Sequence, residues 1–237
     1  MKANGYVIHE TDKIVVIATG FRNHSHNRKT GAMIQTWILV KSQDPVTAVQ
    51  TGTDEHVCGL CPLRGQHHDA LIGPTSRACY VNVGQAPLQI WKSWRGGGYP
   101  VMAPHDLPHL FADRAVRFGA YGEPVLIPIE FVRRVTKLAS AWTGYTHMWR
   151  DPAVAAYKEF FMASTDASDY LAAQGMGWRT FTVSAAPLPT EVVCPASAEA
   201  GHRTTCDQCR LCGGTTVKAK SIQIQPHGSG AKFLRVA

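Results

Sequence analysis

The chain has 237 residues, of which 45% are hydrophobic and 17% are charged, and its formal net charge is +7. This balance predicts a globular protein and excludes a disordered chain, which combines low hydrophobicity with high charge. No apolar run approaches the ~18 residues of a membrane span, and the N-terminus lacks the apolar stretch of a signal peptide, so we expect a cytoplasmic protein without membrane contact.

The first half of the chain combines short apolar segments with polar loops. A loop as long as residues 52–78 usually needs a ligand or metal to order it. The glycines that follow residue 95 are typical of a helix end. In chain order we expect a strand at 14–18, a basic loop at 21–30, a strand at 33–40, a long loop at 52–78, a strand at 78–83 and a helix at 85–95.

The second half alternates between predicted strands and helices. Alternation of this kind indicates parallel strands joined by right-handed crossovers. We therefore expect one α/β domain over residues 1–237, with an open parallel sheet or a partial (β/α) barrel. The expected elements are strands at 115–121, 142–147, 160–164, 178–184, 191–194 and 221–225, and helices at 127–140, 152–159 and 168–174.

Seven cysteines give the strongest functional signal, in two Cys-rich regions at 52–84 and 194–214. Their odd number and the expected cytoplasmic setting argue against a disulfide framework. Two residues between thiols let both thiolates face one centre, so the spacing predicts metal binding. The seven are the C-x2-C pair Cys58 and Cys61, then Cys79, Cys194, and the C-x2-C-x2-C run Cys206, Cys209 and Cys212.

The compact C-x2-C-x2-C run resembles the three-cysteine run of bacterial ferredoxins. Zinc ribbons instead pair two C-x2-C knuckles. Although Cys194 precedes a proline as a ferredoxin ligand does, it lies upstream of the run, so the order differs. The spacing favours one or two [4Fe-4S] clusters, with Zn²⁺ as the alternative.

The cysteines divide most simply into three and four. Cys58, Cys61 and Cys79 form an N-terminal cysteine group with one ligand position unfilled. Either a histidine (His56, His67 or His68) completes that site or it stays open for a substrate, as a catalytic centre requires. Cys194, Cys206, Cys209 and Cys212 form a C-terminal cysteine group that closes a second site. The sequence also permits Cys194 in the first site, or one shared site with spare thiols.

Functional residues of parallel α/β folds gather at the carboxyl ends of strands. Among the residues at these ends, Tyr145, His147 and His227 are candidate catalytic residues, as proton donors or ligands facing a metal centre. Arg28 and Lys29 are candidates for holding an anionic group of a substrate. The predicted strand ends are Tyr121, 143–147, 164–166, Ser184, Cys194 and His227.

Several segments resemble the uncharacterised "gene product eighty-eight" domain family of bacteriophages and plasmids. The resemblance spans roughly residues 30–228 and implies a mobile-element protein acting inside a host cell, without implying an activity. The segments that carry it are Arg64–Gln85, Thr143–His147, Gly177–Phe181, and Cys194–Ser197 with the cysteine run that follows.

A looser architectural similarity is to radical S-adenosylmethionine enzymes. They combine a partial parallel barrel with a three-cysteine cubane cluster that keeps one iron open, which implies S-adenosylmethionine as a cofactor. Their C-x3-C-x2-C spacing is absent here, where the N-terminal group reads C-x2-C-x17-C. Only the glycines at 96–98 offer a glycine-rich segment.

Three functions follow from these observations. The first is an iron–sulfur enzyme that binds a nucleotide or an S-adenosylmethionine-like ligand at an open iron. The second is a protein whose metals only order its loops and which binds nucleic acid through basic segments: no acidic residue follows Asp207, and none lies between Lys13 and Asp44. The third is a regulator or inhibitor that binds a host protein.

Overall fold

The computed structural model describes residues 3–25, 27–67, 73–101, 106–228 and 231–233. The strands among them are β1 (Gly5–Glu10), β2 (Ile14–Thr19), β3 (Ile34–Val40), β4 (Ala115–Tyr121), β5 (Ala141–Thr143), β6 (Tyr145–Thr146), β7 (Met162–Asp166), β8 (Thr180–Val183), β9 (Glu191–Val193) and β10 (Ser221–Ile224). The α-helices are α1 (Pro45–Thr51), α2 (Glu55–Cys58), α3 (Ala86–Arg95), α4 (Ile129–Leu138), α5 (Tyr170–Gly175) and α6 (Cys206–Cys209). The 3-10 helices are η1 (Pro62–Arg64), η2 (Leu107–Phe111), η3 (Pro124–Leu126), η4 (Pro152–Glu159), η5 (Gly214–Thr216) and η6 (Ala231–Phe233).

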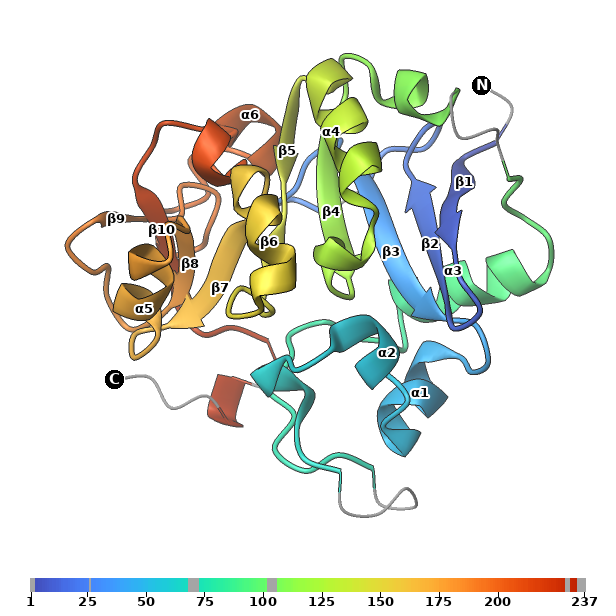
Figure 1. Cartoon of the computed structure of the whole chain (residues 1–237), viewed down its shortest axis with the longest axis horizontal. Coiled ribbons are helices and arrows are strands. Elements are labelled where there is room, and N and C mark those ends of the chain that lie inside the picture. The colour runs from blue at the N-terminus through green and yellow to red at the C-terminus, as the bar shows by residue number, and fades with distance from the viewer. Residues whose placement is uncertain (1–2, 26, 68–72, 102–105, 229–230, 234–237) are drawn as a thin grey trace.

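The strands form two five-stranded sheets, with orders β1-β2-β3-β4-β5 and β6-β7-β8-β10-β9 (Figure 1). All pairs in the second sheet are parallel, as are β3-β4 and β4-β5. The α/β fold expected from the sequence is therefore confirmed, whereas the partial barrel stays a prediction.

The edge of the first sheet is antiparallel, which corrects the expectation of parallel strands throughout. β1 pairs with β2, and β2 with β3, in antiparallel register. Only Thr11, Asp12 and Lys13 separate β1 from β2. A connection this short permits a hairpin but no crossover, so the pair is antiparallel. β1 itself was not predicted, because its apolar run Tyr6–Ile8 has only three residues.

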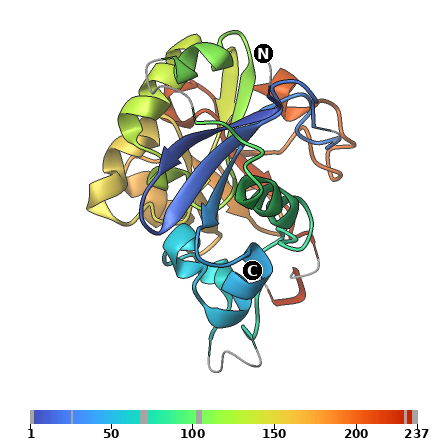
Figure 2. The same ribbon diagram turned by 90° about the vertical axis from the view of Figure 1, so that its right-hand side faces the viewer.

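The first sheet is buried between helices. Every residue of β3 is buried, as its almost continuous apolar run predicts for a strand covered on both faces. α3 and α4 lie on opposite faces of this sheet (Figure 2). On α3, Trp91 donates from Nε1 to the carbonyl oxygen of Val40 at 2.9 Å, which places this tryptophan against the core. No helix in the described part of the chain has the length and apolar character needed to cross a membrane.

The predicted strand at 142–147 is divided between the two sheets at Gly144. A Cβ atom on Gly144 would lie 2.4 Å from Cδ1 of Phe161, so only glycine fits where the chain passes from β5 to β6. Phe161 also packs against Phe118 of β4, with ring centroids 5.4 Å apart. This contact continues the main apolar core from one sheet to the other.

β4 carries a bulge in its middle. Gln35 pairs with Arg117 and Trp37 with Tyr121, so four steps along β4 match two along β3. Gly119 adopts a φ of +67° at this point. Bulges with glycine in the left-handed region bend a strand and re-aim its side chains. The bulge thus helps to turn residues of β4 toward the cavity described below.

The predicted strand at 78–83 is wrong for the described residues. This segment has no strand pairing, and Tyr80 is exposed. Arg77 donates from Nη1 to the carbonyl oxygens of Cys79 and Val81, at 3.2 and 3.4 Å. These bonds bring Arg77 against the backbone of its own segment in place of a neighbouring strand.

Candidate metal centres and the central cavity

The C-x2-C pair of the N-terminal cysteine group lies at the end of a short helix. Cys58 ends α2, and its carbonyl oxygen accepts a hydrogen bond from the N–H of Cys61 at 3.1 Å. Arg64 fixes this turn, because its Nη2 lies 2.6 Å from Oδ1 of Asp54 and also donates to the carbonyl oxygen of Gly52 at 2.8 Å. Asp54 is only 1% exposed, so this ion pair is a buried anchor of the segment.

Cys79 reaches the pair across 17 intervening residues because the chain doubles back. Gln66 and Thr75 form an antiparallel bridge, with N–H···O distances of 3.0 and 2.9 Å. Beyond it, the N–H groups of Ala78 and Cys79 both donate to the carbonyl oxygen of Leu63, at 3.1 and 3.0 Å. The segment that follows Cys61 is therefore bonded directly to the segment that carries Cys79.

A hydrogen bond anchors the C-terminal cysteine group to the second sheet. The N–H of Cys194 donates to the carbonyl oxygen of Gln223 in β10 at 2.8 Å. α6 begins at Cys206, whose N–H donates to the carbonyl oxygen of Lys29 at 2.8 Å. Cys194 and Cys212 are buried in a small apolar core beside this sheet. All seven cysteines of the chain are free thiols.

Burial and neighbouring thiols raise the pKa of several cysteines. Burial raises the pKa of Cys212 to about 12 and that of Cys206 to about 11, and the charge of Cys194 adds to both. Burial also raises the pKa of Cys58 well above its ordinary value, with the charge of Cys61 as the next cause. The thiols that raise these pKa values belong in each case to the same group, in agreement with the division into three and four.

Both cysteine groups border one cavity of about 330 Å³, which we call the central cavity. Cys58, Cys61 and Cys79 all line it, and Cys206 lines it from the C-terminal group. The other lining residues are Asn27, Lys29, Thr30, Leu63, Tyr80, Val81, Arg117, Gly119, Ala120, Tyr121, Gly122, Glu123, Thr143, Tyr145, His147, Ser164, Phe181, Val183, Ile224 and His227.

Strand periodicity explains part of this lining. Thr143, Tyr145 and His147 occupy alternate positions and therefore share a face. On β4, Arg117 and Tyr121 both line the cavity. Burial lowers the pKa of Arg117, but Tyr80 foremost, and then Tyr145 and Cys206, raise it overall. Arg117 thus lies between Tyr80 and the C-terminal group.

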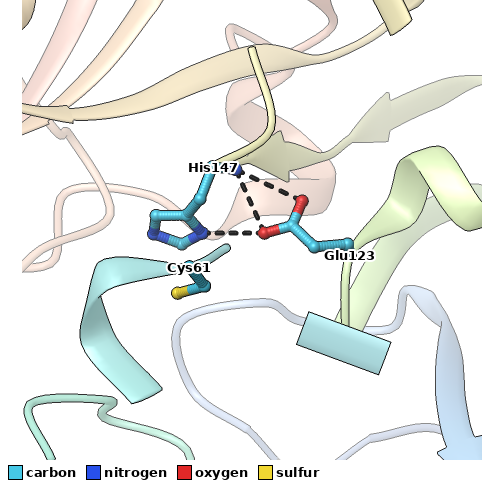
Figure 3. A group of neighbouring side chains, drawn as sticks. All are labelled: Cys61, Glu123 and His147. Carbon is cyan, nitrogen blue, oxygen red and sulfur yellow. Dashed lines mark hydrogen bonds and ion pairs between the residues drawn. The ribbon is translucent and has the colours of Figure 1, made fainter. Parts of the chain in front are cut away.

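Glu123, His147 and Cys61 form the tightest cluster of potential metal ligands among the described residues (Figure 3), with ligand atoms within 4.8 Å of one another. Nδ1 of His147 lies 2.9 Å from Oε1 of Glu123, and the backbone N–H of His147 donates to both carboxylate oxygens. Thr146 donates from Oγ1 to Oε2 of Glu123 at 2.6 Å.

The negative charges of Cys61 and Glu123 change the pKa of His147. Burial lowers its pKa, but Cys61 and Glu123 raise it well above its ordinary value. With Nδ1 bonded to Glu123, Nε2 of His147 is left to face another partner. A carboxylate that holds one nitrogen of a histidine while the other ligates a metal is a recurrent arrangement.

The structure brings most of the predicted site residues to the central cavity. Tyr145, His147, His227 and Lys29 line it, whereas Arg28 is exposed and is not part of the wall. His227 lies at the cavity edge, where its ring packs on Tyr80 with centroids 5.3 Å apart.

The histidines considered for the fourth ligand position lie elsewhere. His56 is not in the wall of the central cavity, and neither is His67. Nε2 of His67 lies 3.8 Å from Oδ1 of Asp54. His68 lies outside the described residues.

Sequence reasoning missed Glu123 and Arg117. Glu123 follows Tyr121 and Gly122 at the carboxyl end of β4, so extending the search for strand ends by two residues would have included it. Arg117 lies inside a strand whose other residues are mostly apolar. A lone arginine in such a strand is a usable signal, because charged residues are rarely buried without a partner.

Comparison with known proteins returned no match to a family model, to a curated protein or to a solved structure. The resemblance to the phage and plasmid family therefore stays a prediction.

Proposed function

We propose that the protein is an iron–sulfur enzyme that holds one [4Fe-4S] cluster in each cysteine group and binds a small-molecule substrate in the central cavity. The observation that carries this proposal is the cavity wall itself. It gathers three thiols of one group, one thiol of the other, and the candidate proton carriers Tyr145 and His147. Convergence of ionisable groups and ligands on one pocket is typical of an active site.

The spacing of the thiols supports a cluster rather than a single zinc ion. Tetrahedral zinc with Zn–S bonds of about 2.3 Å holds its sulfur ligands roughly 3.8 Å apart. Among the described residues, which include all seven cysteines, no three thiols lie within 4.8 Å of one another. A polynuclear centre, whose ligands bind separate iron atoms, suits this wider spacing.

The two groups are suited to different tasks. The C-terminal group supplies four thiols and would hold its cluster completely. The N-terminal group supplies three, so one iron of its cluster would remain available to a ligand in the central cavity. When bound, such a cluster supplies an electron or a Lewis-acidic iron to that ligand.

His147 is placed to hold or move a proton in this arrangement. Glu123 binds Nδ1 and the backbone N–H of the same residue, which fixes both the tautomer and the ring orientation. Nε2 is then the atom that exchanges a proton with a ligand bound beside Cys61. Tyr145 is hydrogen-bonded to Cys212 and is the corresponding proton carrier beside the C-terminal group.

The test is metal and sulfide analysis with electron paramagnetic resonance on protein purified without oxygen. We expect about eight irons and eight sulfides per chain, as two cubane clusters require. Cys79→Ser should lose one cluster and Cys212→Ser the other. Perturbation of the reduced spectrum by S-adenosylmethionine or a nucleotide should vanish in Cys79→Ser alone. Colourless protein carrying only zinc would overturn the proposal.

A second candidate rests on the cluster of Cys61, Glu123 and His147, whose spacing fits one mononuclear metal ion with an open position. Here Glu123→Gln should remove the metal, and Cys58→Ser should leave it in place. The iron–sulfur proposal predicts the reverse, since Glu123 is not a cluster ligand in it. Metal content of these two variants separates the candidates.

The basic segments and the phage and plasmid resemblance motivate a non-catalytic alternative, in which the metals order the loops and the protein binds nucleic acid or a host protein. Nucleic-acid affinity would fall with salt by about 0.9 log unit per log unit of salt for each phosphate neutralised. A regulator of a host protein would instead co-purify with it and show no such dependence.

A further inference from the structure

We propose that the central cavity contains an anion-binding subsite formed by Arg117 and Lys29, and that its ligand is a small organic molecule bearing a carboxylate or phosphate. This inference rests on the proposed function only in taking the cavity as the substrate site. It replaces the predicted pair Arg28 and Lys29 by a pair whose members both line the cavity.

Arg117 is a partly buried cation without an acidic partner. Its Nη2 donates to Oη of Tyr80 at 2.9 Å. No carboxylate of the described residues lies within ion-pair distance of Arg117, and no other hydrogen bond of its side chain is found among them. A guanidinium offers five N–H donors in a planar fork that matches a carboxylate or phosphate. Most of these donors thus remain available to a ligand.

The carboxylate in the cavity wall is already engaged. Glu123 accepts hydrogen bonds from Oγ1 of Thr146 and from His147. Glu123 also lies beside Cys61, with ligand atoms of the two within 4.8 Å of each other. Glu123 therefore lies beside the N-terminal cysteine group, whereas Arg117 is hydrogen-bonded to Tyr80 and also lines the cavity. A cation at one end and an engaged carboxylate at the other orient an anionic ligand.

The loop before β3 adds a second cation and a free hydroxyl. Lys29 lines the cavity together with Cys206. Lys29 also helps to lower the pKa of Glu199, so it is shared with that carboxylate. Thr30 is 3% exposed, lines the same cavity, and its Oγ1 has no hydrogen-bond partner among the described residues.

A buried hydroxyl without a partner is unfavourable by about 1–3 kcal/mol, so it points to a polar group that the ligand supplies. The loop is held in place, because the N–H groups of Cys206 and Asp207 donate to the carbonyl oxygens of Lys29 and Thr30. Oη of Tyr121, also buried in the cavity wall, has no hydrogen-bond partner in the described part of the chain either, and offers a further contact.

The rest of the wall suits an organic body rather than a bare ion. Tyr145 and Phe181 pack with ring centroids 4.3 Å apart. Val81, Val183 and Ile224 complete the apolar part of the wall. A volume of about 330 Å³ falls at the small end of ligand pockets. The ligand we infer is therefore a compact, partly apolar anion.

The experiment uses matched probes on metal-loaded protein. Isothermal titration calorimetry compares phenylacetate with phenylacetamide, and adenosine 5′-monophosphate with adenosine. We expect at least one anion to bind 10-fold or more tightly than its neutral partner. Preference within the first pair identifies a carboxylate ligand, and preference within the second identifies a phosphate.

Substitutions locate the preference. Arg117→Gln should lower anion affinity 10- to 100-fold and leave the neutral probe unchanged, because charged hydrogen bonds are lost from the anion alone. Arg117→Lys should recover part of the loss, and Lys29→Gln should lower affinity 3- to 10-fold. Arg28→Gln, on the exposed neighbour outside the cavity, is the control and should change affinity less than 2-fold.

Absence of any anion preference in the metal-loaded protein would overturn the inference, and so would full preference in Arg117→Gln. Iron and sulfide are measured in the same samples. Anion preference without clusters would leave the subsite standing and reject the iron–sulfur proposal. Clusters without anion preference would support the iron–sulfur proposal and reject the subsite.

Discussion

The two Cys-rich regions hold their cysteines in place in different ways. Within residues 194–214, Cys194 is bonded to a parallel sheet and lies in an apolar core together with Cys212. Within residues 52–84, the described residues include no strand, and Cys58 and Cys79 are held by short helical turns and loop hydrogen bonds. One region is built into the fold, and the other is a loop that folds back on itself.

This difference matches the exposure of the thiols to the central cavity. All three thiols of the N-terminal group line it, whereas Cys206 is the one thiol of the C-terminal group that does. A centre held by the sheet is suited to a fixed structural or electron-carrying role. A centre held by a loop with its ligands facing a cavity is suited to binding a substrate.

The largest effect should follow from removing the anchor of the N-terminal region. Arg64→Gln leaves the buried carboxylate of Asp54 without its partner, which should lower the free energy of unfolding by about 3 kcal/mol or more. Under the iron–sulfur proposal, it should also remove about half of the iron bound by the protein. Arg150→Gln is the control: its ion pair with Asp169 is exposed, so it should change stability by less than about 1 kcal/mol. Urea unfolding with iron analysis measures both, and equal losses would contradict the comparison.

Metal removal should affect the two regions unequally. Under the iron–sulfur proposal, we expect chelation to raise amide hydrogen exchange at least 100-fold over residues 59–65, because this segment belongs to no sheet and is held by turn and loop hydrogen bonds. The amides of Cys194 and Ser221 should keep most of their protection, since both donate to carbonyl oxygens of the second sheet or its adjoining segment. Mass-spectrometric exchange measures this contrast, and uniform loss of protection would contradict it.

Gly144 joins the two halves and should tolerate no side chain. Gly144→Ala forces a Cβ to within 2.4 Å of Phe161, which we expect to destabilise the protein by about 2 kcal/mol. Gly175→Ala is the matched control, because a Cβ there has no atom within 4 Å and should be neutral or slightly stabilising. Thermal unfolding of the two variants gives the comparison.

The last prediction concerns pH, with an effect of about 2 kcal/mol over the range measured. Burial raises the pKa of Cys212 from 9.0 to about 12 in the folded chain. The folded state therefore holds this proton more tightly than the unfolded state. The resulting stabilisation is complete below pH 9 and is lost between pH 9 and 12, by about 1.4 kcal/mol per pH unit. Urea unfolding of metal-free protein at pH 8.5 and 10.5 should show this loss, and Cys212→Ser should lack that part of the slope.

Local signals predicted many elements well. The apolar runs at 14–18 and 33–40 correspond to β2 and β3, and the strand at 115–121 corresponds to β4. The helix predicted at 85–95 is α3, which ends before Gly96 as expected. These predictions succeed because a covered strand or a helix end depends on residues that are neighbours in the sequence.

The sequence by itself determined the α/β class, the helix ends and the grouping of cysteines into closely spaced pairs and runs, since these depend on spacing along the chain. Only the tertiary structure decided that Cys79 returns to Leu63, that the first sheet has an antiparallel edge, and that Arg117 and Glu123 enter the central cavity. The physical reason is that strand order, register and a bulge depend on contacts between distant segments, which local patterns do not encode.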